Sequence, residues 1–497
     1  MAAPHLVPTP TSMTALPDAA FRIGSGAEIT GDPAAVAALQ RHLDPLPAAP
    51  SSGSIDLSVQ AGGPAGSYRL AVGTASVAVT GADAAGLFAG IQTLTQLLAE
   101  GPDGWTIPAV RIDDAPRFAY RGVMLDVARH FHGVDTVKAY IDRASSLKFN
   151  VLHLHLSDDQ GWRLEILSRP ELTARAAATA VGGDAGGFYT QDDYREIVAY
   201  AAAHHMTVVP EIDVPGHTHA VSLAYPELSE QPVLSEHVQE TVAQFGGGLP
   251  ENGSAYEGMA VGFSSLKIHD EQTSAFLRDV FAEVAALTPG PYLHFGGDEA
   301  LGTDPADFAE FVARASALVV ATGKTPIAWH EAGAADGLAP GTIGQYWGFV
   351  SPTNGMDDKT RRFVAGGGRI ILSPADAIYL DMKFDAASPL GLTWANGPTS
   401  LRRAYEWDPA TVIDGIGDAE ILGVEAPLWT ETVRDLADID ALAFPRIAAA
   451  AEAGWSAPFG ATPERTWESF RTRVAALEPL WTRLGISFTP VAEGEPA

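Results

Sequence analysis

Residues 121–128 (RGVMLDVA) and 150–158 (NVLHLHLSD) are short apolar segments on either side of the amphipathic stretch 134–148, VDTVKAYIDRASSLK. Strands that are apolar on both faces and alternate with helices predict a parallel sheet covered by helices. Six more segments of this kind follow, at 207–215, 292–299, 326–331, 342–348, 369–376 and 421–431. Eight such units predict an α/β fold, a closed (β/α)8 TIM barrel.

A doubly wound open sheet is the alternative fold. It requires a glycine-rich turn after its first strand, which holds a phosphate. The sequence after 121–128 continues as RHF and has no such turn, which favours the barrel.

The residues before the barrel follow a different pattern. Residues 21–112 contain short alternating segments such as 68–73 (YRLAVG) and 76–81 (SVAVTG), with helical patterns at 35–43 and 84–100. This mixture predicts a small α+β domain. The expected organisation is a flexible N-terminal arm (1–17), an α+β accessory domain (18–115) and a catalytic (β/α)8 barrel with C-terminal helices (116–497).

The composition excludes several classes of protein. The 497-residue chain carries 61 acidic and 31 basic residues, a net charge of −30, which disfavours nucleic acid and anionic membranes as partners. It has no cysteine, which excludes disulfides, thiol nucleophiles and cysteine-ligated metals. No apolar run reaches the ~18 residues of a membrane span, and the N-terminus lacks the regions of a signal peptide. We expect a cytoplasmic protein; the alternative is a secreted one whose signal is missing from this sequence.

Polar and aromatic residues gather at the carboxyl ends of the predicted strands, where barrel enzymes carry their functional side chains. One aspartate there is commonly a helix cap and one tryptophan part of the core, but eight strand ends in a row are hard to explain in this way. Carboxylates and arginine bind hydroxyl groups, and indole rings pack on the C–H faces of a sugar. Paired carboxylates in such a pocket are typical of glycoside hydrolysis. The residues are Asp126, Arg129, Asp158, Asp159, Asp213, His217, His219, Asp298, Glu299, Trp329, Glu331, Trp347, Tyr379, Asp381, Trp429 and Glu431.

Five motifs closely resemble those of the β-N-acetylhexosaminidases of glycoside hydrolase family 20. They are PRFAYRGVMLDVARHF (116–131), NVLHLHLSDDQGWRLEI (150–166), EIDVPGHTHA (211–220), YLHFGGDEA (292–300) and GVEAPLWTE (423–431). The resemblance covers most of residues 116–485, and GLFAGIQTLTQLL (86–98) resembles part of the family's accessory domain. It implies a retaining exo-β-N-acetylhexosaminidase that releases terminal non-reducing GlcNAc or GalNAc from oligosaccharides or glycoconjugates, without a cofactor or a metal.

Asp298 and Glu299 are neighbours on one predicted strand, so their side chains should point to opposite faces. The usual retaining pair of carboxyl groups lies roughly 5–5.5 Å apart and faces across the scissile bond, which this arrangement fits poorly. The resemblance implies that the 2-acetamido oxygen of the substrate attacks C1 instead and forms an oxazolinium intermediate.

The resemblance also implies the roles of the catalytic positions. Glu299 resembles the general acid, which must be protonated near neutral pH and later activates water. Asp158 and His217 resemble a hydrogen-bonded relay beside it. Asp298 resembles the residue that holds the acetamide N–H and offsets ring charge, and Tyr379 the phenol that aims the acetamide oxygen.

Three groups of substrate-binding positions follow from the same resemblance. The first group encloses the acetyl methyl, the second binds the 3- and 4-hydroxyls, and the third forms the floor of the pocket and contacts the 6-hydroxyl. In this order they are Trp329, Trp347 and Trp429; Arg129 and Glu431; and Asp381 and Trp394.

The histidines permit a second function, a metal-dependent TIM-barrel hydrolase, with ligands among His153, His155, His217, His219 and His294. Against it, the His153–His155 pair lies on the second strand, and the tryptophans would have no purpose. We expect the other polar residues to be supporting or structural: Asp126, Asp159, Asp213, His153 and His155.

Residues 221–262 form a long segment after the third strand, with three consecutive glycines at 246–248. Long loops on this face of a barrel are often lids or subsite walls. A solvated insertion is the equally weighted alternative.

Overall fold

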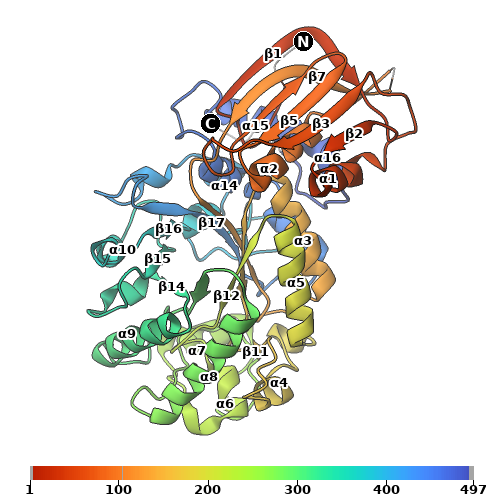
Figure 1. Cartoon of the computed structure of the whole chain (residues 1–497). Helices are drawn as coiled ribbons and strands as arrows, with labels where there is room; N and C mark the ends of the chain where they lie inside the picture. Colours follow the sequence, from red (N-terminus) through yellow and green to blue (C-terminus); the bar gives the residue numbers. More distant parts are fainter. Residues whose placement is uncertain (1–3, 103, 492–497) are drawn as a thin grey trace.

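The structure, a computed structural model, describes residues 4–102 and 104–491 and contains the expected closed barrel of eight parallel strands (Figure 1). β17 pairs with β8, which closes the ring. All eight predicted strands are confirmed, although each ends earlier than expected at its carboxyl end. The strands are β8 (Tyr120–Asp126), β9 (Val151–His155), β12 (Thr207–Glu211), β13 (Tyr292–His294), β14 (Thr325–Trp329), β15 (Ile343–Tyr346), β16 (Ile370–Leu372) and β17 (Ile421–Leu428).

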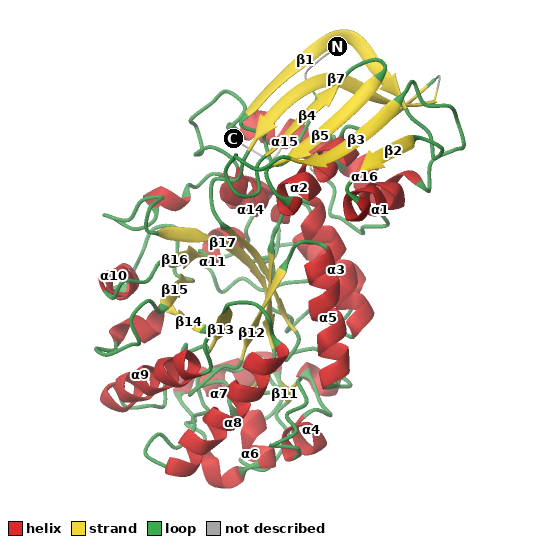
Figure 2. Cartoon of the chain, in the orientation of Figure 1, coloured by secondary structure: helices red, strands yellow, loops and turns green. Residues whose placement is uncertain are grey.

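Helices surround the barrel, and several shorter ones sit on its loops (Figure 2). The longer helices are α3 (Val134–Ser146), α5 (Gln191–Ala203), α7 (Glu236–Phe245), α8 (Glu271–Leu287), α9 (Pro305–Ala321), α10 (Met356–Ala365) and α14 (Arg446–Trp455). The shorter ones are α4 (Glu171–Ala176), α6 (His219–Ala224), α11 (Ala375–Ile378), α12 (Leu401–Tyr405), α13 (Leu436–Ala443), α15 (Trp467–Ala475) and α16 (Glu478–Arg483). Within residues 4–102 and 104–491, no helix is long and apolar enough to cross a membrane.

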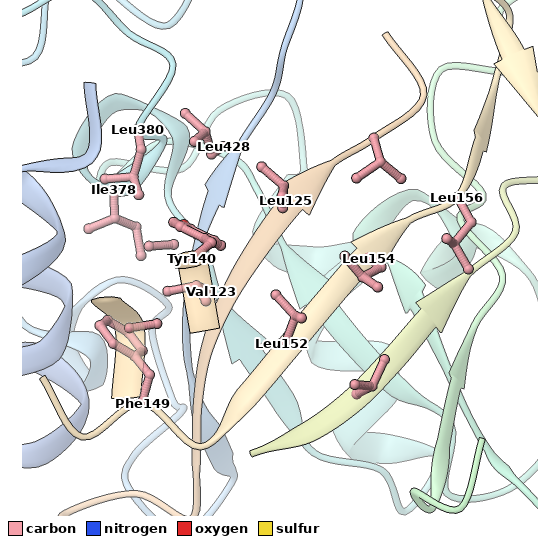
Figure 3. Close-up of a cluster of buried hydrophobic side chains, with 14 of the residues drawn as sticks. Val123, Leu125, Tyr140, Phe149, Leu152, Leu154, Leu156, Ile378, Leu380 and Leu428 are labelled. Carbon is pink, nitrogen blue, oxygen red and sulfur yellow. The ribbon is translucent and has the colours of Figure 1, made fainter. Parts of the chain in front are cut away.

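The side chains of β9 alternate between two environments. Leu152 and Leu154 point outward and pack with residues such as Val123 and Tyr140 (Figure 3). The alternate residues of the strand, His153 and His155, point into the barrel and are fully buried.

The barrel interior is therefore layered. Its amino-terminal end is filled by an apolar cluster, which consists of Tyr120, Val151, Val209, Ile327, Ile343, Ile371 and Leu422. Above this plug lies a polar layer that includes His153, Glu211, His294, Gln345 and Glu425, all with no exposed surface. The candidate site lies above the polar layer, at the carboxyl ends of the strands.

The N-terminal part of the chain forms the expected α+β unit, a sheet with helices α1 (Pro33–Leu43) and α2 (Ala84–Gln96) against it (Figure 2). The strand order is β1-β7-β4-β5-β3-β2, and β6 pairs with β7. The strands are β1 (Ser12–Arg22), β2 (Glu28–Gly31), β3 (Ser54–Val59), β4 (Tyr68–Val72), β5 (Ser76–Gly81), β6 (Ala99–Gly101) and β7 (Gly104–Asp114). The sequence patterns did not predict β7, and they predicted only the end of β1.

The expected loose arm over residues 1–17 is wrong for the part that the structure describes. Leu6 and Val7 are buried, and residues from Ser12 onward form the start of β1. The Gln96 side chain accepts from Val7 N (3.0 Å) and donates to Val7 O (2.7 Å), so the buried backbone of this segment is paired. Residues 1–3 lie outside the described residues.

A buried charge cluster joins the accessory domain to the barrel. On the accessory side, Asp114 Oδ2 accepts from Tyr68 Oη at 2.7 Å. From the barrel side, Lys148 Nζ (3.2 Å) and Trp455 Nε1 (3.0 Å) donate to the same oxygen. Burial lowers the pKa of Lys148, while Asp114 opposes this by stabilising the ammonium.

The first prediction concerns this cluster. Lys148→Met should destabilise the folded chain by about 3 kcal/mol, because it leaves the Asp114 charge buried without its cation. The measurement is urea unfolding, followed by fluorescence. Lys138→Met is the control, since Lys138 pairs with Glu196 at the surface and should cost less than about 1 kcal/mol. Equal losses in both variants would contradict a role for the cluster.

Candidate active site

The loop after β13 presents two carboxylates to the same side of the pocket. β13 ends at His294, and Gly296 (φ 69°) and Gly297 (φ 94°) turn the chain before Asp298 and Glu299. A Cβ on Gly296 would lie 1.6 Å from Asp213 Oδ1, so only glycine fits there. The expectation that Asp298 and Glu299 lie on a strand and point to opposite faces is wrong, because the strand ends before them.

Both carboxylates converge on one imidazole nitrogen. His217 Nε2 lies 3.7 Å from Asp298 Oδ2 and 3.4 Å from Glu299 Oε2. His217 (φ 54°) and Glu299 (φ 42°) both adopt left-handed backbone conformations, which cost a non-glycine residue about 1 kcal/mol each. Such strain is concentrated at sites where a side chain must be aimed.

The other nitrogen of His217 faces Asp158. His217 Nδ1 lies 3.2 Å from Asp158 Oδ1, which gives the order Glu299–His217–Asp158 that the sequence predicts. Burial by itself would lower the pKa of His217, but Asp158 and Asp298 stabilise the imidazolium and hold that pKa well above its ordinary value.

Asp158 is surrounded by cationic groups. Its Oδ2 lies 2.8 Å from Arg129 Nη1 and 2.7 Å from His155 Nε2. Burial would raise the pKa of Asp158, but Arg129 and His217 outweigh burial and hold it well below its usual range. The carboxylate therefore stays ionised in a fully buried position, which only compensating charges permit.

Asp213 lies behind the catalytic loop. Its Oδ1 accepts from Gly297 N at 3.0 Å. Burial, followed by the charge of Asp298, raises the pKa of Asp213 well above its usual range. Burial also raises the pKa of Asp298, which His217 opposes. Asp213 therefore favours its neutral form. The cationic His217 stabilises the ionised form of the neighbouring Asp298.

An aromatic pocket adjoins the carboxylates. Trp329, Tyr379 and Trp429 pack in one buried cluster, with Trp347 at its edge. The ring centroids of Trp329 and Trp429 are 6.1 Å apart, and Trp394, which is 46% exposed, lies 5.6 Å from Tyr379. Four indoles and one phenol therefore pack together in one aromatic cluster.

The far end of the pocket is polar. Neither carboxylate oxygen of Asp381, nor Oε2 of Glu431, has a hydrogen-bond partner among the described residues. Burial raises the pKa of Asp381 well above its usual range, and it raises that of Glu431 to about 7 against the opposing effect of Arg129. Buried acceptors without partners are suited to bind the hydroxyl groups of a ligand.

Comparisons with known proteins identify this arrangement. The family model described as "Glycosyl hydrolase family 20, catalytic domain" matches residues 118–305 and 303–458, and that described as "Glycosyl hydrolase family 20, domain 2" matches residues 3–115. The chain belongs to glycosyl hydrolase family 20. The family resemblance inferred from the motifs and the expected glycoside hydrolase class are both confirmed.

Individual relatives agree with this family 20 assignment. The "Beta-N-acetylhexosaminidase" of Cellulomonas fimi is 44% identical over 430 residues, which cover 85% of this chain and 80% of the relative. A solved "Glycoside Hydrolase Family 20 beta-N-Acetylglucosaminidase" is 62% identical with a TM-score of 0.93 and 99% coverage of both chains. The Streptomyces plicatus N-acetyl-β-hexosaminidase in complex with Thio-NAglucal is 42% identical, with a TM-score of 0.87 over 98% of this chain and 96% of that one.

Two carboxylates of the family 20 site had no role in the sequence-based prediction. Glu211, the last residue of β12, accepts the Trp329 indole N–H at 2.8 Å. Glu331 accepts the Trp347 indole N–H at 2.9 Å. The signal for Glu211 was a lone charge inside an apolar strand, and Glu331 stood among the strand-end residues without a role.

The supporting residues have mainly structural contacts. Asp126 Oδ2 accepts from Thr430 N at 3.1 Å, and Asp159 Oδ1 accepts from Ser264 Oγ at 2.6 Å. These bonds tie the ends of distant strands and loops together. His155 is different, because it contacts Asp158 directly.

The candidate metal ligands are already engaged with protein groups. Four buried triads of histidine and carboxylate side chains have donor atoms within 4.8 Å of one another, and two of the triads contain Asp158. The Arg129 guanidinium contacts Asp158 and would repel a divalent cation bound there. This charge arrangement argues against a metal ion at the two triads that contain Asp158.

The segment 221–262 folds into a small lobe with its own core. The core consists of Val238, Tyr256, Ala260 and Phe263, with Val242 packed against it. The Gln160 side chain donates to Gly258 O at 2.9 Å, which fastens the lobe to the β9 loop. A Cβ on Gly262 would contact the Leu301 side chain and the Glu299 carbonyl, so the lobe lies against the catalytic loop.

The second prediction follows from the relay geometry. Asp158→Asn removes the largest group that raises the pKa of His217, so the imidazolium loses its proton at lower pH. The alkaline limb of kcat/KM against pH should move to lower pH by about one unit. Asp142→Asn, which changes a surface carboxylate on α3, is the control. An alkaline limb that stays in place in Asp158→Asn would contradict the relay.

Proposed function

We propose that the chain hydrolyses terminal β-linked N-acetylhexosamine with retention of configuration, and that the substrate's own acetamide is the nucleophile. The chain is a family 20 β-N-acetylhexosaminidase, and the proposal concerns how its residues perform the reaction. The observation that carries it is the convergence of Asp298 and Glu299 from one loop onto His217, beside a cluster of aromatic side chains. A pair of carboxylates on one side of the pocket fits an acid and an acetamide-holding group better than an acid facing a nucleophile.

In the first step, Glu299 donates its proton to the glycosidic oxygen while the acetamide oxygen forms a bond to C1. The C1–O bond to the leaving group breaks, and its electron pair goes to the departing alcohol. Attack within the substrate needs no encounter with a second molecule, which lowers the entropic cost of the step. Asp298 accepts from the acetamide N–H and stabilises the positive charge of the oxazolinium.

The aromatic pocket orients the acetamide. Trp329, Trp347 and Trp429 enclose the methyl group, and the Tyr379 hydroxyl donates to the acetamide oxygen. Because these rings also pack on one another, the acetyl group has little freedom to leave the attack position.

In the second step, Glu299 acts as the base. Its carboxylate takes a proton from a water molecule, whose oxygen attacks C1 as the bond to the acetamide oxygen breaks. Two displacements at C1 restore the original configuration, so the first product is the β-anomer.

The polar end of the pocket binds the hydroxyl groups of the sugar. Arg129 and Glu431 bind the 3- and 4-hydroxyls, and Asp381 and Trp394 contact the 6-hydroxyl. The unpaired oxygens of Asp381 and Glu431 support these assignments. A solved structure of the Streptomyces plicatus enzyme, 42% identical, contains the product GlcNAc. The expected location in the cytoplasm stays a prediction.

The lobe at residues 221–262 shapes the leaving-group side of the site. Leu301, two residues after the acid, is 68% exposed, and Val233 of the lobe (43% exposed) packs near Gly302. A leaving group that receives its proton from Glu299 must pass close to these side chains. This supports the subsite-wall alternative over a merely solvated insertion.

The third prediction concerns Glu299. Glu299→Gln should reduce kcat/KM by about 10³-fold for substrates with a poor leaving group, such as a chitooligosaccharide, and far less for a dinitrophenyl glycoside. Proton donation matters only where the leaving oxygen is basic. Steady-state kinetics on the two substrates provide the measurement, and equal losses on both would exclude Glu299 as the acid.

The fourth prediction tests the nucleophile. An aryl glycoside with a 2-hydroxyl in place of the acetamide should be hydrolysed very poorly, although it is smaller and can enter the pocket. A thiazoline analogue of the oxazolinium should inhibit at concentrations far below KM, because it resembles the state that Asp298 and Tyr379 stabilise. Mass spectrometry after incubation with a 2-fluoro glycoside is the counter-test. A covalent ester on a protein carboxylate would refute the mechanism.

A further inference from the structure

One buried carboxylate in the polar layer of the barrel touches both parts of the site. Glu211 Oε2 lies 2.5 Å from His155 Nδ1, and its Oε1 accepts the Trp329 indole N–H at 2.8 Å. Glu211 is the last residue of β12, and both of its oxygens face protein side chains, so it acts through them. Its two oxygens are divided between two different side chains.

The first branch leads to the catalytic acid. His155 Nε2 lies 2.7 Å from Asp158 Oδ2, Asp158 Oδ1 lies 3.2 Å from His217 Nδ1, and His217 reaches Glu299 at 3.4 Å. The order is thus Glu211, His155, Asp158, His217 and Glu299, with every intervening contact made by a buried side chain. Glu211 stabilises a protonated His155, whose second N–H then faces Asp158.

The second branch leads to the acetamide pocket. Trp329 is one of the indole walls and is fully buried, and its N–H is held by Glu211. A charged acceptor for this N–H fixes the rotation of the ring. The distance between the indole face and the acetyl methyl therefore depends on a residue outside the pocket.

We infer that Glu211 is a positioning residue that couples the proton relay behind Glu299 to the indole wall of the acetamide pocket. The inference deepens the proposed function and rests on it. A carboxylate is required because it has two acceptor oxygens, whereas a carboxamide has one and presents N–H groups on its other side. Glu211→Gln keeps the shape of the side chain, but it removes the charge that strengthens both contacts and leaves an acceptor oxygen for only one of them.

Other charged groups face Glu211 and affect how the groups around it titrate with pH. His153 Nε2 lies 3.2 Å from Oε2, and His294 Nδ1 lies 3.1 Å from Oε1. Burial lowers the pKa of His294, whereas burial of His153 and His155 is outweighed by their carboxylate neighbours, which raise those pKa values to about 9 and about 10. The groups around Glu211 and Asp158 are His153, His155, His294, Glu425, Asp213, Arg129, Asp126, Asp159 and His217.

The matched control is Glu425, a carboxylate of the same buried layer. Its Oε1 lies 2.9 Å from His153 Nδ1 and accepts from Gln345 Nε2 at 2.6 Å. No contact joins it to His155 or Trp329 among the described residues. Glu425→Gln should disturb the layer as Glu211→Gln does, without reaching either branch.

The experiment compares the full-length wild type, Glu211→Gln and Glu425→Gln in two readouts. The first is the alkaline limb of kcat against pH. His155 loses its main stabilising anion in Glu211→Gln, so it loses its proton at lower pH, and the limb should move down by about one unit. The second is the preference for an N-acetyl over an N-propanoyl aryl glycoside, which should fall about tenfold as the Trp329 wall loosens.

The outcomes are distinct. The coupling is supported if both readouts change in Glu211→Gln and neither changes in Glu425→Gln. It is overturned if only one readout or neither changes in Glu211→Gln, or if the two variants change equally. The His155→Gln/Glu211→Gln double variant should have the same alkaline limb as His155→Gln alone, because Glu211 acts on the relay only through His155. A wild type that does not cleave N-acetylhexosaminides would instead refute the proposed function.

A second route applies if Glu211→Gln does not fold. His155→Gln, Trp329→Phe and their combination form a double-mutant cycle on kcat. Coupling through Glu211 predicts a departure from multiplicative effects of roughly threefold or more, although the two side chains belong to different branches. Multiplicative effects would overturn the inference.

Discussion

The Asp158 carboxylate, held between Arg129, His155 and His217, is the interaction on which the rest of the site depends. An ionised carboxylate with no exposed surface is tolerated only when cations and hydrogen-bond donors surround it. The same cations are needed elsewhere: Arg129 stabilises Glu431, and His217 faces the catalytic loop. Each charged group therefore stabilises two neighbours, which offsets the cost of burying it. Removal of any member would leave another charge buried without its compensating partner.

The barrel supplies the rigidity that this arrangement needs. Leucines of β9 point outward into the layer of helices, and the alternate histidines point inward, so packing on one side of the strand fixes imidazoles on the other. The apolar plug at the amino-terminal end keeps water from the polar layer above it. Charges in a dry and rigid environment interact more strongly than in water, which explains the large shifts in the pKa values of His217 and Asp158.

A local turn then converts this scaffold into a reactive site. Gly296 and Gly297 permit a left-handed path after β13, and the turn brings Asp298 and Glu299 to the same imidazole. The aromatic cluster lies beside them, at the end of β14 and on the segments that follow β15, β16 and β17. Residues from separate strands thus meet around one sugar, which is the general advantage of the carboxyl-terminal face of a barrel.

Local sequence patterns were sufficient to predict the eight strands and the accessory domain, because apolar periodicity is a property of short segments. Strand-end polarity and the family motifs singled out the candidate site residues, whose roles stay predictions. The direction of the Asp298 and Glu299 side chains was predicted wrongly. It depends on a turn at Gly296, where the distant Asp213 leaves no room for a side chain. Likewise, the paired N-terminal segment depends on Gln96, and the two contacts of Glu211 depend on residues from β9 and β14. These contacts join positions far apart in the chain, so only the tertiary structure, which closes the barrel and brings them within hydrogen-bond distance, could decide them.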